Sequence, residues 1–136
     1  MNDCLFCNII AGTVPAQKVY EDDTTYAFLD IGPVSKGHTL IVPKEHAVNL
    51  TEGSEAAATA MMKTVYKIAP GIVKALGASG YNLGMNHGTD AGQLVFHTHV
   101  HLMPRYAGEP RTFVKSHPAQ EELATIAEQI RKEIFF

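Results

Sequence analysis

The stretch "HTHVHLMPR", residues 97–105, places histidines at positions 97, 99 and 101, with one residue between each pair. Three of the seven histidines of the chain therefore lie within residues 97–101. A spacing of two is the period of a β-strand, whose successive side chains point to opposite faces. The spacing does not fit a helix, because residues i and i+2 lie on different sides of a helix. We therefore predict a strand over residues 94–104 that presents its histidines to something polar.

The two faces of this predicted strand differ in composition. One face combines aromatic, β-branched and leucine side chains, as a buried sheet face does: Phe96, Thr98, Val100 and Leu102. The other face is a row of imidazoles with an apolar residue at each end: Val95, His97, His99, His101 and Met103. We expect the fold to bury the first face and the chemistry to use the second.

Three interpretations of the histidine row are open from the residues alone. The simplest is a strand whose histidines face solvent, although three polar imidazoles on one face contribute little to folding. A second is a catalytic metal site with three imidazole ligands. A third is nucleophilic catalysis, since a neutral imidazole with an ordinary pKa of about 6.5 is a competent nucleophile near neutral pH. In that case a neighbouring imidazole can hydrogen-bond an oxyanion or supply a proton.

The loop "NHGTDAGQ", residues 86–93, precedes the histidine row and favours the third interpretation. Gly88 and Gly92 allow tight turns and exposed backbone N–H groups, which form the kind of concavity that holds phosphate. Asn86 and Gln93 add neutral side-chain donors. Donors beside a row of histidines fit a phosphate ester or anhydride better than they fit a bare metal ion.

The rest of the chain predicts an α+β fold in which an antiparallel sheet packs against helices. Strands are expected at residues 18–22, 25–30, 39–43 and 81–86, and helices at 5–12, 55–76 and about 118–134. Pro70 and Gly71 fall inside the second helix, so we expect a kink or a break there. Pro118 suits the first turn of the last helix.

Length and composition favour one globular domain spanning residues 1–136. The net charge of −3 and the scattered Lys and Arg residues predict no general attraction to nucleic acid or to an anionic membrane. No stretch has the apolar length of a transmembrane span, and the N-terminal residues do not resemble a signal peptide. With two cysteines and no secretion signal, we expect a reducing, cytoplasmic setting.

Several segments together resemble the histidine triad (HIT) family, and bacterial Hint-like nucleotide hydrolases in particular. The run "NHGTDAGQLVFHTHVHLMPR", residues 86–105, is similar to the family signature. The earlier segments "FLDI" (28–31) and "GHTLIVPKEH" (37–46) follow in the family order. The similarity runs from about Cys4 to Arg105, whereas the C-terminal helix is less typical. The resemblance implies a HIT-like fold whose sheet continues across a homodimer.

The resemblance also implies roles for individual residues. His99 matches the nucleophile that attacks the α-phosphorus of a nucleotide and forms a nucleotidyl-histidine, which water then hydrolyses. His101 matches its phosphate-contacting partner, and Asp30 matches the residue that binds the ribose hydroxyls. Further phosphate-side contacts are implied at His38, Asn86, Gly92, Gln93 and the backbone of Val95. The walls around a purine are implied at Phe6, Val14, Phe28 and Ile31. From the residues alone, each wall residue is equally consistent with ordinary core, and Asp30 with a turn cap.

One position departs from the Hint branch of the family. That branch often has a serine where this chain has Leu94, directly after Gln93. The hydroxyl that would touch the bridging or leaving atom is therefore absent. Protonation of the leaving group must then come from His101, from solvent or from the substrate itself.

Cys4 and Cys7 have the spacing C-x-x-C, which has three interpretations. They can form a redox pair, although no βαβ pattern follows them, or they can be two ordinary buried residues of a short helix. The third interpretation comes from the resemblance, which implies one structural zinc ion per chain. Its other ligands are then His46 and His97, and the site is a closed tetrahedral set of two thiolates and two imidazoles.

The function implied is a nucleotidyl hydrolase acting on purine nucleoside phosphoramidates or related AMP esters and anhydrides. Within the same class, the alternative is hydrolysis of dinucleoside polyphosphates. Two other classes remain: a nucleotide-binding module without significant turnover, and a metalloenzyme that uses the histidine row as a catalytic metal site.

Overall fold

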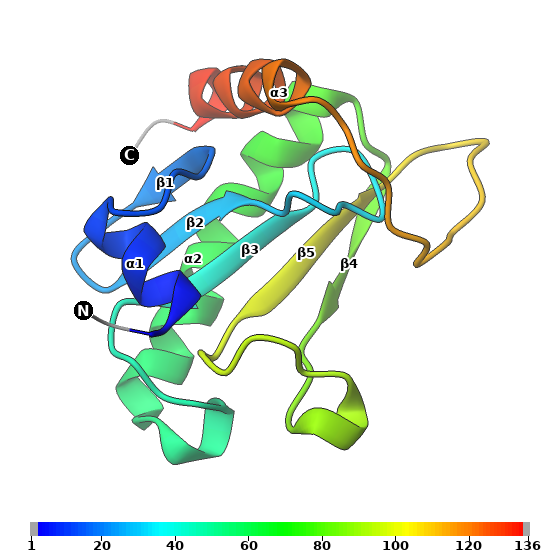
Figure 1. Cartoon of the computed structure of the whole chain (residues 1–136). Coiled ribbons are helices and arrows are strands. Elements are labelled where there is room, and N and C mark those ends of the chain that lie inside the picture. The colour runs from blue at the N-terminus through cyan, green and yellow to red at the C-terminus, as the bar shows by residue number, and fades with distance from the viewer. Residues whose placement is uncertain (1–2, 135–136) are drawn as a thin grey trace.

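The computed structural model describes residues 3–134, and it forms a five-stranded antiparallel sheet packed with helices on both faces (Figure 1). The strands are β1 (Lys18–Glu21), β2 (Thr25–Leu29), β3 (Thr39–Pro43), β4 (Gly80–Gly84) and β5 (Val100–Arg105). Their order in the sheet is β1-β2-β3-β5-β4, and every neighbouring pair is antiparallel. The predicted α+β class is therefore confirmed.

The helices divide between the two faces of the sheet. They are α1 (Leu5–Ala11), α2 (Glu55–Leu76) and α3 (Gln120–Glu133), with short 3-10 turns η1 (Leu50–Glu52) and η2 (Thr89–Ala91). α2 runs behind the sheet and α1 crosses in front of it, while α3 contacts α2 and β1 at the top of the view (Figure 1). None of the helices within residues 3–134 is both long enough and apolar enough to cross a membrane.

Two hydrophobic clusters hold these layers together. The larger one joins the sheet to the buried faces of α2 and α3 and includes Ile41, Ile68 and Leu102, which are fully buried. The smaller one packs α1 on the opposite face of β2 and β3. The central strands β2 and β3 are covered on both sides, and all residues of each are buried. This explains why they read as continuous apolar runs and not as an alternating pattern.

Turn and cap residues set the ends of several of these elements. The Ser54 hydroxyl accepts a hydrogen bond from the Ala57 N–H at 3.0 Å and begins α2. Gly77 ends the helix in the left-handed conformation with φ of 70°. The Asp22 carboxylate accepts the N–H groups of Thr24 and Thr25 at 2.9 and 2.8 Å, which fixes the turn between β1 and β2.

The predicted histidine strand is the main error in the predicted elements. Residues 94–99 form bends and irregular chain, and the strand begins only at Val100. The Thr98 N–H donates to the Ala47 carbonyl at 2.9 Å, so this segment bonds to a loop and not to β3. Phe96, which was assigned to the buried face, is 47% exposed as a result.

Smaller differences concern the helices and β4. A kink or a break was predicted at Pro70 and Gly71; α2 is one continuous helix there, so the break is wrong, while the kink stays a prediction. Pro70 lies on the exposed side of the helix. α3 begins at Gln120, which leaves Pro118 before the helix. β4 begins one residue before the predicted range of 81–86 and ends two residues before the end of that range. Differences of this size are common at the ends of elements.

Candidate active site and metal centre

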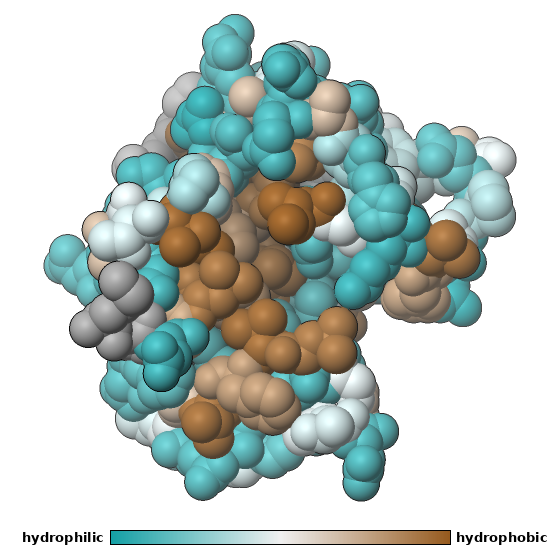
Figure 2. Space-filling model, in the orientation of Figure 1, coloured by the Kyte–Doolittle hydropathy of each residue, from teal (hydrophilic) through white to brown (hydrophobic). Residues whose placement is uncertain are grey.

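A cavity of about 470 Å³ opens on the face of the sheet that carries α1. Its lining comes from α1 and the loop after it, β2, the loop at 30–38, β3, the segment from the end of β4 to His99, β5 and the segment after β5. Figure 2 shows apolar side chains gathered around this hollow. The volume lies within the range of about 300–1,000 Å³ that is typical of small-molecule sites.

The apolar wall contains all four residues predicted to surround a purine: Phe6, Val14, Phe28 and Ile31. Phe6 and Phe28 are buried, and their rings meet edge to face with centroids 5.3 Å apart. Ile31 lies at the rim and is 70% exposed. A rigid aromatic floor with an aliphatic rim is suited to a flat heterocycle, which gains from both burial and stacking.

His99 lines the cavity and has distinct ring nitrogens. Its Nδ1 lies 2.7 Å from the carbonyl oxygen of His97. A carbonyl only accepts hydrogen bonds, so Nδ1 must carry the proton. The lone pair of the neutral ring is therefore on Nε2. The His99 ring is also held edge-on against Phe6, with centroids 5.0 Å apart.

His38 and His101 form a relay with a defined direction. The Val34 N–H donates to His38 Nδ1 at 3.1 Å, so the proton of His38 lies on Nε2. That nitrogen donates to His101 Nδ1 at 2.9 Å, and His101 must then carry its own proton on Nε2. Both ring nitrogens of His38 are thus engaged by protein atoms, and its phosphate-side contact stays a prediction.

Burial keeps these imidazoles neutral. It lowers the pKa of His38 and of His99, because a buried ring is penalised when it becomes charged. The pKa of His101 falls to about 4 for the same reason, with further contributions from the neighbouring rings of His99 and His38. At neutral pH the cavity therefore offers a lone pair at His99 Nε2 and an N–H donor at His101 Nε2.

Asp30 lies at the edge of the cavity beside the histidine relay. Its Oδ1 accepts the Gly32 N–H at 2.8 Å, which fixes the carboxylate in place. Its Oδ2 lies 3.7 Å from His38 Nε2. A carboxylate has about four acceptor positions, so Asp30 retains the capacity to accept hydrogen bonds from ligand hydroxyls.

The side-chain amide of Gln93 is engaged by three backbone groups. Its side chain is buried and its amide nitrogen donates to the carbonyls of Val48 at 2.6 Å and Val95 at 3.0 Å. Its amide oxygen accepts the Gly88 N–H at 2.8 Å. The predicted donation from Gln93 to a phosphate would require one of these bonds to break. The side chain instead fixes the loop that borders the cavity.

The other residues of this loop lie where the sequence places them. Asn86, Gly92, Leu94 and Val95 all line the cavity. The Asn86 amide donates to the Gly92 carbonyl at 3.3 Å and is exposed at the rim. Leu94 is 75% exposed and offers no polar atom in its side chain.

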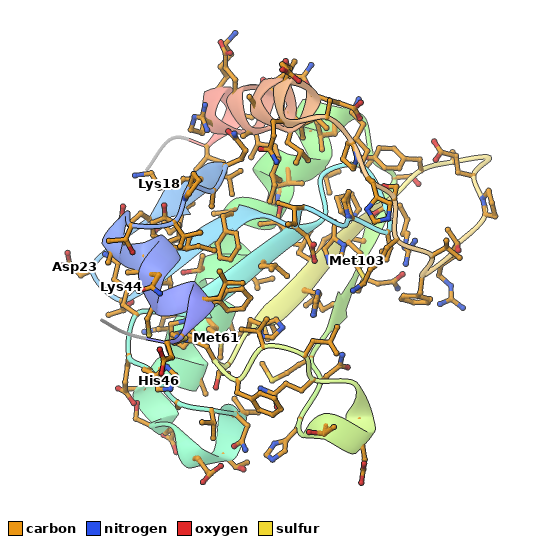
Figure 3. All side chains as sticks on the ribbon, in the orientation of Figure 1. Lys18, Asp23, Lys44, His46, Met61 and Met103 are labelled. Atoms are coloured by element: carbon orange, nitrogen blue, oxygen red, sulfur yellow. The ribbon has the colours of Figure 1, made fainter. Side chains whose placement is uncertain are left out.

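The lining also includes residues to which the sequence analysis gave no role in the site, among them Met103, Phe113 and Lys115. Met103, which Figure 3 labels, continues the period of two from His101, so its position was foreseeable. Phe113 and Lys115 come from the irregular segment after β5. No local pattern marks them, because only the tertiary path of that segment brings them to the cavity.

A second cluster lies apart from the cavity relay and joins Cys4, Cys7, His46 and His97. The Nδ1 of His97 lies 3.3 Å from Cys4 Sγ, 3.5 Å from Cys7 Sγ and 3.1 Å from His46 Nδ1. The Nδ1 of His46 lies 3.4 Å from Cys7 Sγ. Figure 3 places His46 beside the start of α1, although it is 39 residues from Cys7 in sequence.

These separations fit a tetrahedral zinc ion. Zinc bonds of about 2.3 Å to sulfur and 2.0–2.1 Å to nitrogen imply nitrogen–sulfur separations of about 3.6 Å and a nitrogen–nitrogen separation of about 3.3 Å. The His97 Nε2 lies 2.8 Å from the Pro43 carbonyl and donates to it, so the lone pair on Nδ1 points toward the sulfurs. His97 thus belongs to this cluster, while His99 and His101 belong to the cavity.

An antiparallel sheet that carries a row of histidines into a nucleotide-sized cavity defines the class of histidine triad proteins. The HIT domain family profile matches residues 11–108. The chain therefore belongs to the histidine triad family.

The chain is similar to two relatives whose names state an activity and to a solved structure of the same family. Adenylylsulfatase HINT3 of Arabidopsis thaliana is 48% identical over 104 residues, which are 76% of this chain and 53% of that protein. This chain thus spans about half the length of the plant relative. Adenosine 5'-monophosphoramidase hnt1 of Schizosaccharomyces pombe is 38% identical over 134 residues, covering 96% of this chain and 98% of that protein. The crystal structure of a Zn-bound histidine triad family protein from Mycobacterium smegmatis has a TM-score of 0.88 at 34% identity, with 97% and 93% of the two chains covered.

Proposed function

We propose that this protein hydrolyses purine nucleotides at the α-phosphorus through a nucleotidyl-histidine formed on His99. The observation that carries the proposal is the hydrogen bond from His99 Nδ1 to the His97 carbonyl at 2.7 Å. It leaves the lone pair on Nε2 of a side chain that lines a nucleotide-sized cavity. One relative is named as an adenylylsulfatase and another as an AMP phosphoramidase. Both names support hydrolysis of a nucleotide, although the leaving group differs between the two.

The reaction has two displacements at phosphorus. His99 Nε2 attacks the α-phosphorus, the phosphorus–nitrogen bond forms, and the bond to the leaving group breaks. Water then attacks the same phosphorus, AMP leaves, and His99 regains its neutral form as the proton of the water passes to solvent. His101 Nε2–H donates to a phosphoryl oxygen as charge develops there, and His38 holds it in the required tautomer.

The remaining lining residues bind the nucleoside. Asp30 accepts hydrogen bonds from the ribose hydroxyls through the oxygen that Gly32 does not occupy. Phe6, Val14, Phe28 and Ile31 enclose the base. The phosphate end of the cavity is bordered by Asn86, Gly92 and the backbone of Val95. The Gln93 side chain holds this segment in place by donating to the Val95 carbonyl.

Replacement of His99 tests the proposal. His99→Ala is expected to lower kcat for an adenosine phosphoramidate or adenylyl sulfate by about 10⁴-fold or more, because the nucleophile is removed. His87→Ala, an exposed histidine of the neighbouring loop, serves as the matched control. Thermal melts of both variants should match the wild type. Near-normal turnover by His99→Ala would exclude His99 as the nucleophile.

The same assay separates the alternative functions. A diadenosine polyphosphate turned over faster than the phosphoramidate identifies a dinucleoside polyphosphate hydrolase. Nucleotide binding without turnover of any of these substrates identifies a binding module. Activity that survives complete removal of metal excludes the histidine row as a catalytic metal site.

We further propose one structural zinc ion per chain, held by Cys4, Cys7, His46 and His97. The separations of the four ligand atoms and the hydrogen bond behind His97 support it. Two thiolates and two imidazoles complete a closed site with no position for substrate. Zinc there contributes folding energy and leaves the chemistry to His99 and His101.

We also propose that residues 1–136 form a single HIT domain that assembles as a homodimer in the cytoplasm. β4 is an edge strand, and its side chains at Tyr81 and Leu83 are 41% and 42% exposed. On α2, Met62 and Tyr66 are 52% and 84% exposed and share one helix face. An uncovered edge with apolar side chains favours pairing with a second copy.

A further inference from the structure

The segment after β5 returns to the cavity as a strap, residues 106–119, which has no helix or strand before α3 (Figure 1). Its middle is tied down by the Arg105 guanidinium, whose Nη1 donates to the Thr112 carbonyl at 2.8 Å. Its far end is fixed by Ser116, whose N–H and hydroxyl both donate to the Pro33 carbonyl at 2.9 Å. The residues between these two attachments are therefore held beside the cavity.

Lys115 lies between the two attachments and lines the cavity. Its aliphatic stem lies against Gly32, where an added Cβ would be 3.6 Å from Lys115 Cδ. Gly32 is also the residue whose N–H fixes the Asp30 carboxylate. The lysine stem therefore lies next to the loop that holds Asp30, the carboxylate of the cavity.

Lys115 is the one lysine or arginine among the cavity-lining residues within 3–134, and Asp30 is the one carboxylate. The histidines of the cavity are neutral, as described above. Burial is the main cause of the lowered pKa of His38 and His101, and the positive charge of Lys115 makes a smaller contribution in the same direction. A substrate with several negative charges thus meets a single formal cation.

Leu94 provides an independent observation about the leaving group. It lines the cavity with an apolar side chain that is 75% exposed, so it supplies no proton. An amine must be protonated to leave, whereas the anion of a strong oxyacid departs with its bonding electrons and needs no proton. An amine leaving group therefore depends on the His101 N–H, on solvent or on the substrate for its proton, whereas an oxyanion needs none of these.

We propose that Lys115 is a specificity-determining residue that favours nucleotides whose leaving group is an oxyanion joined as an anhydride, such as sulfate or phosphate. In the step concerned, His99 Nε2 forms its bond to the α-phosphorus and the phosphorus–oxygen bond breaks. The electron pair stays on the departing oxygen beside the Lys115 ammonium. This inference rests on the proposed function.

The test compares two substrates that differ in the charge of the leaving group. Adenylyl sulfate and adenosine 5'-phosphoramidate are assayed with the wild type, Lys115→Met, Lys115→Arg and Lys36→Met. Lys36→Met removes the same charge from the neighbouring loop without changing the lining of the large cavity. The ratio of kcat/KM for the anionic to the neutral leaving group should fall about five- to tenfold in Lys115→Met. It should be restored by arginine and unchanged in Lys36→Met, and the wild-type ratio should decrease with ionic strength.

Equal losses for both substrates, or an effect of Lys36→Met as large as that of Lys115→Met, would overturn the role of Lys115. If the wild type turns over neither substrate, calorimetric binding of ADP and AMP decides instead. Lys115→Met should then weaken the binding of ADP more than the binding of AMP. An equal change in the two affinities would refute the role of Lys115 without contradicting nucleotide binding by the wild type. A wild-type protein that binds neither nucleotide overturns the proposed function and this inference together.

Discussion

A single hydrogen bond decides the chemical character of each histidine at the cavity. The His97 carbonyl places the proton of His99 on Nδ1, and the Val34 N–H places that of His38 on Nε2. His38 Nε2 then donates to His101 Nδ1, which leaves the proton of His101 on its Nε2. The same side chain thus presents a free lone pair at His99 Nε2, a donor to a neighbouring ring at His38 and an N–H donor at His101, according to the atoms that each ring contacts.

His38 should consequently matter for rate more than for binding. His38→Phe keeps a buried ring but removes both hydrogen bonds, so His101 is no longer restricted to one tautomer. We expect kcat to fall about 10²-fold with a smaller change in KM. His38→Gln, whose amide can still donate to His101, should recover part of the loss. Nitrogen NMR shifts of His101 should report mixed tautomers in the Phe variant, and a single tautomer with unchanged kcat would contradict the relay.

At the scale of elements, the crossing of α2 and the end of α3 depends on the absence of a side chain at Gly71. An added Cβ would lie 2.9 Å from the Glu133 carbonyl oxygen and 3.1 Å from Ile134 Cγ1. The first of these atoms belongs to the backbone, so it cannot rotate away. A glycine in the middle of α2 is therefore explained by the close approach of the α3 backbone, and not by a need for backbone flexibility.

Gly71→Ala should therefore destabilise the protein by about 1–3 kcal/mol, as overpacking does. The usual effect of this change in a helix interior has the opposite sign, a gain of up to about 1 kcal/mol. Pro70→Ala, one residue earlier on the exposed side of α2, is the matched comparison and should raise stability, because it restores a helical N–H. Urea unfolding measures both. A gain in Gly71→Ala would show that α3 shifts to accept the methyl group.

Elements with local signals were predictable, and those fixed by tertiary contacts were not. α2 carries its own cap residues and apolar stripe, and its bounds of Glu55–Leu76 match the prediction. The period of two at residues 97–101 correctly placed the rings of His99 and His101 side by side, with centroids 5.0 Å apart. It did not predict where the ladder begins, because Thr98 bonds to the distant Ala47. In the same way, Lys115 reaches the cavity only through attachments of the strap to Pro33.

At the scale of the whole molecule, the cysteine–histidine cluster connects segments that are remote in the chain. Cys4 and Cys7 lie at α1, His46 follows β3, and His97 precedes β5. A metal ion at this point closes loops of 39 and 90 residues from Cys7. Each closure removes conformational freedom mainly from the unfolded chain.

Removal of zinc should accordingly lower stability while leaving the nucleophile in place. Purified, reduced protein should contain about one zinc ion per chain, and strong chelation should lower Tm by more than about 10 °C. Without chelator, Cys7→Ser should already melt at about the Tm of the chelated wild type. Adding chelator should then change the Tm of this variant little. Elemental analysis that finds no metal, or a Tm that chelation leaves unchanged, would refute a structural zinc.

The free edge of the sheet gives the last prediction. β4 pairs with β5 on one side only, so within residues 3–134 its outer edge presents backbone groups to which no strand is bonded. Leu83 exposes 42% of its surface there, and a charge at that position would resist burial against a second copy. Light scattering at micromolar concentration should give the mass of two chains for the wild type and of one chain for Leu83→Arg. Leu50→Arg, at a similarly exposed leucine of η1, should remain dimeric. A wild-type mass of one chain would show that the edge is left open in solution and that each cavity acts alone.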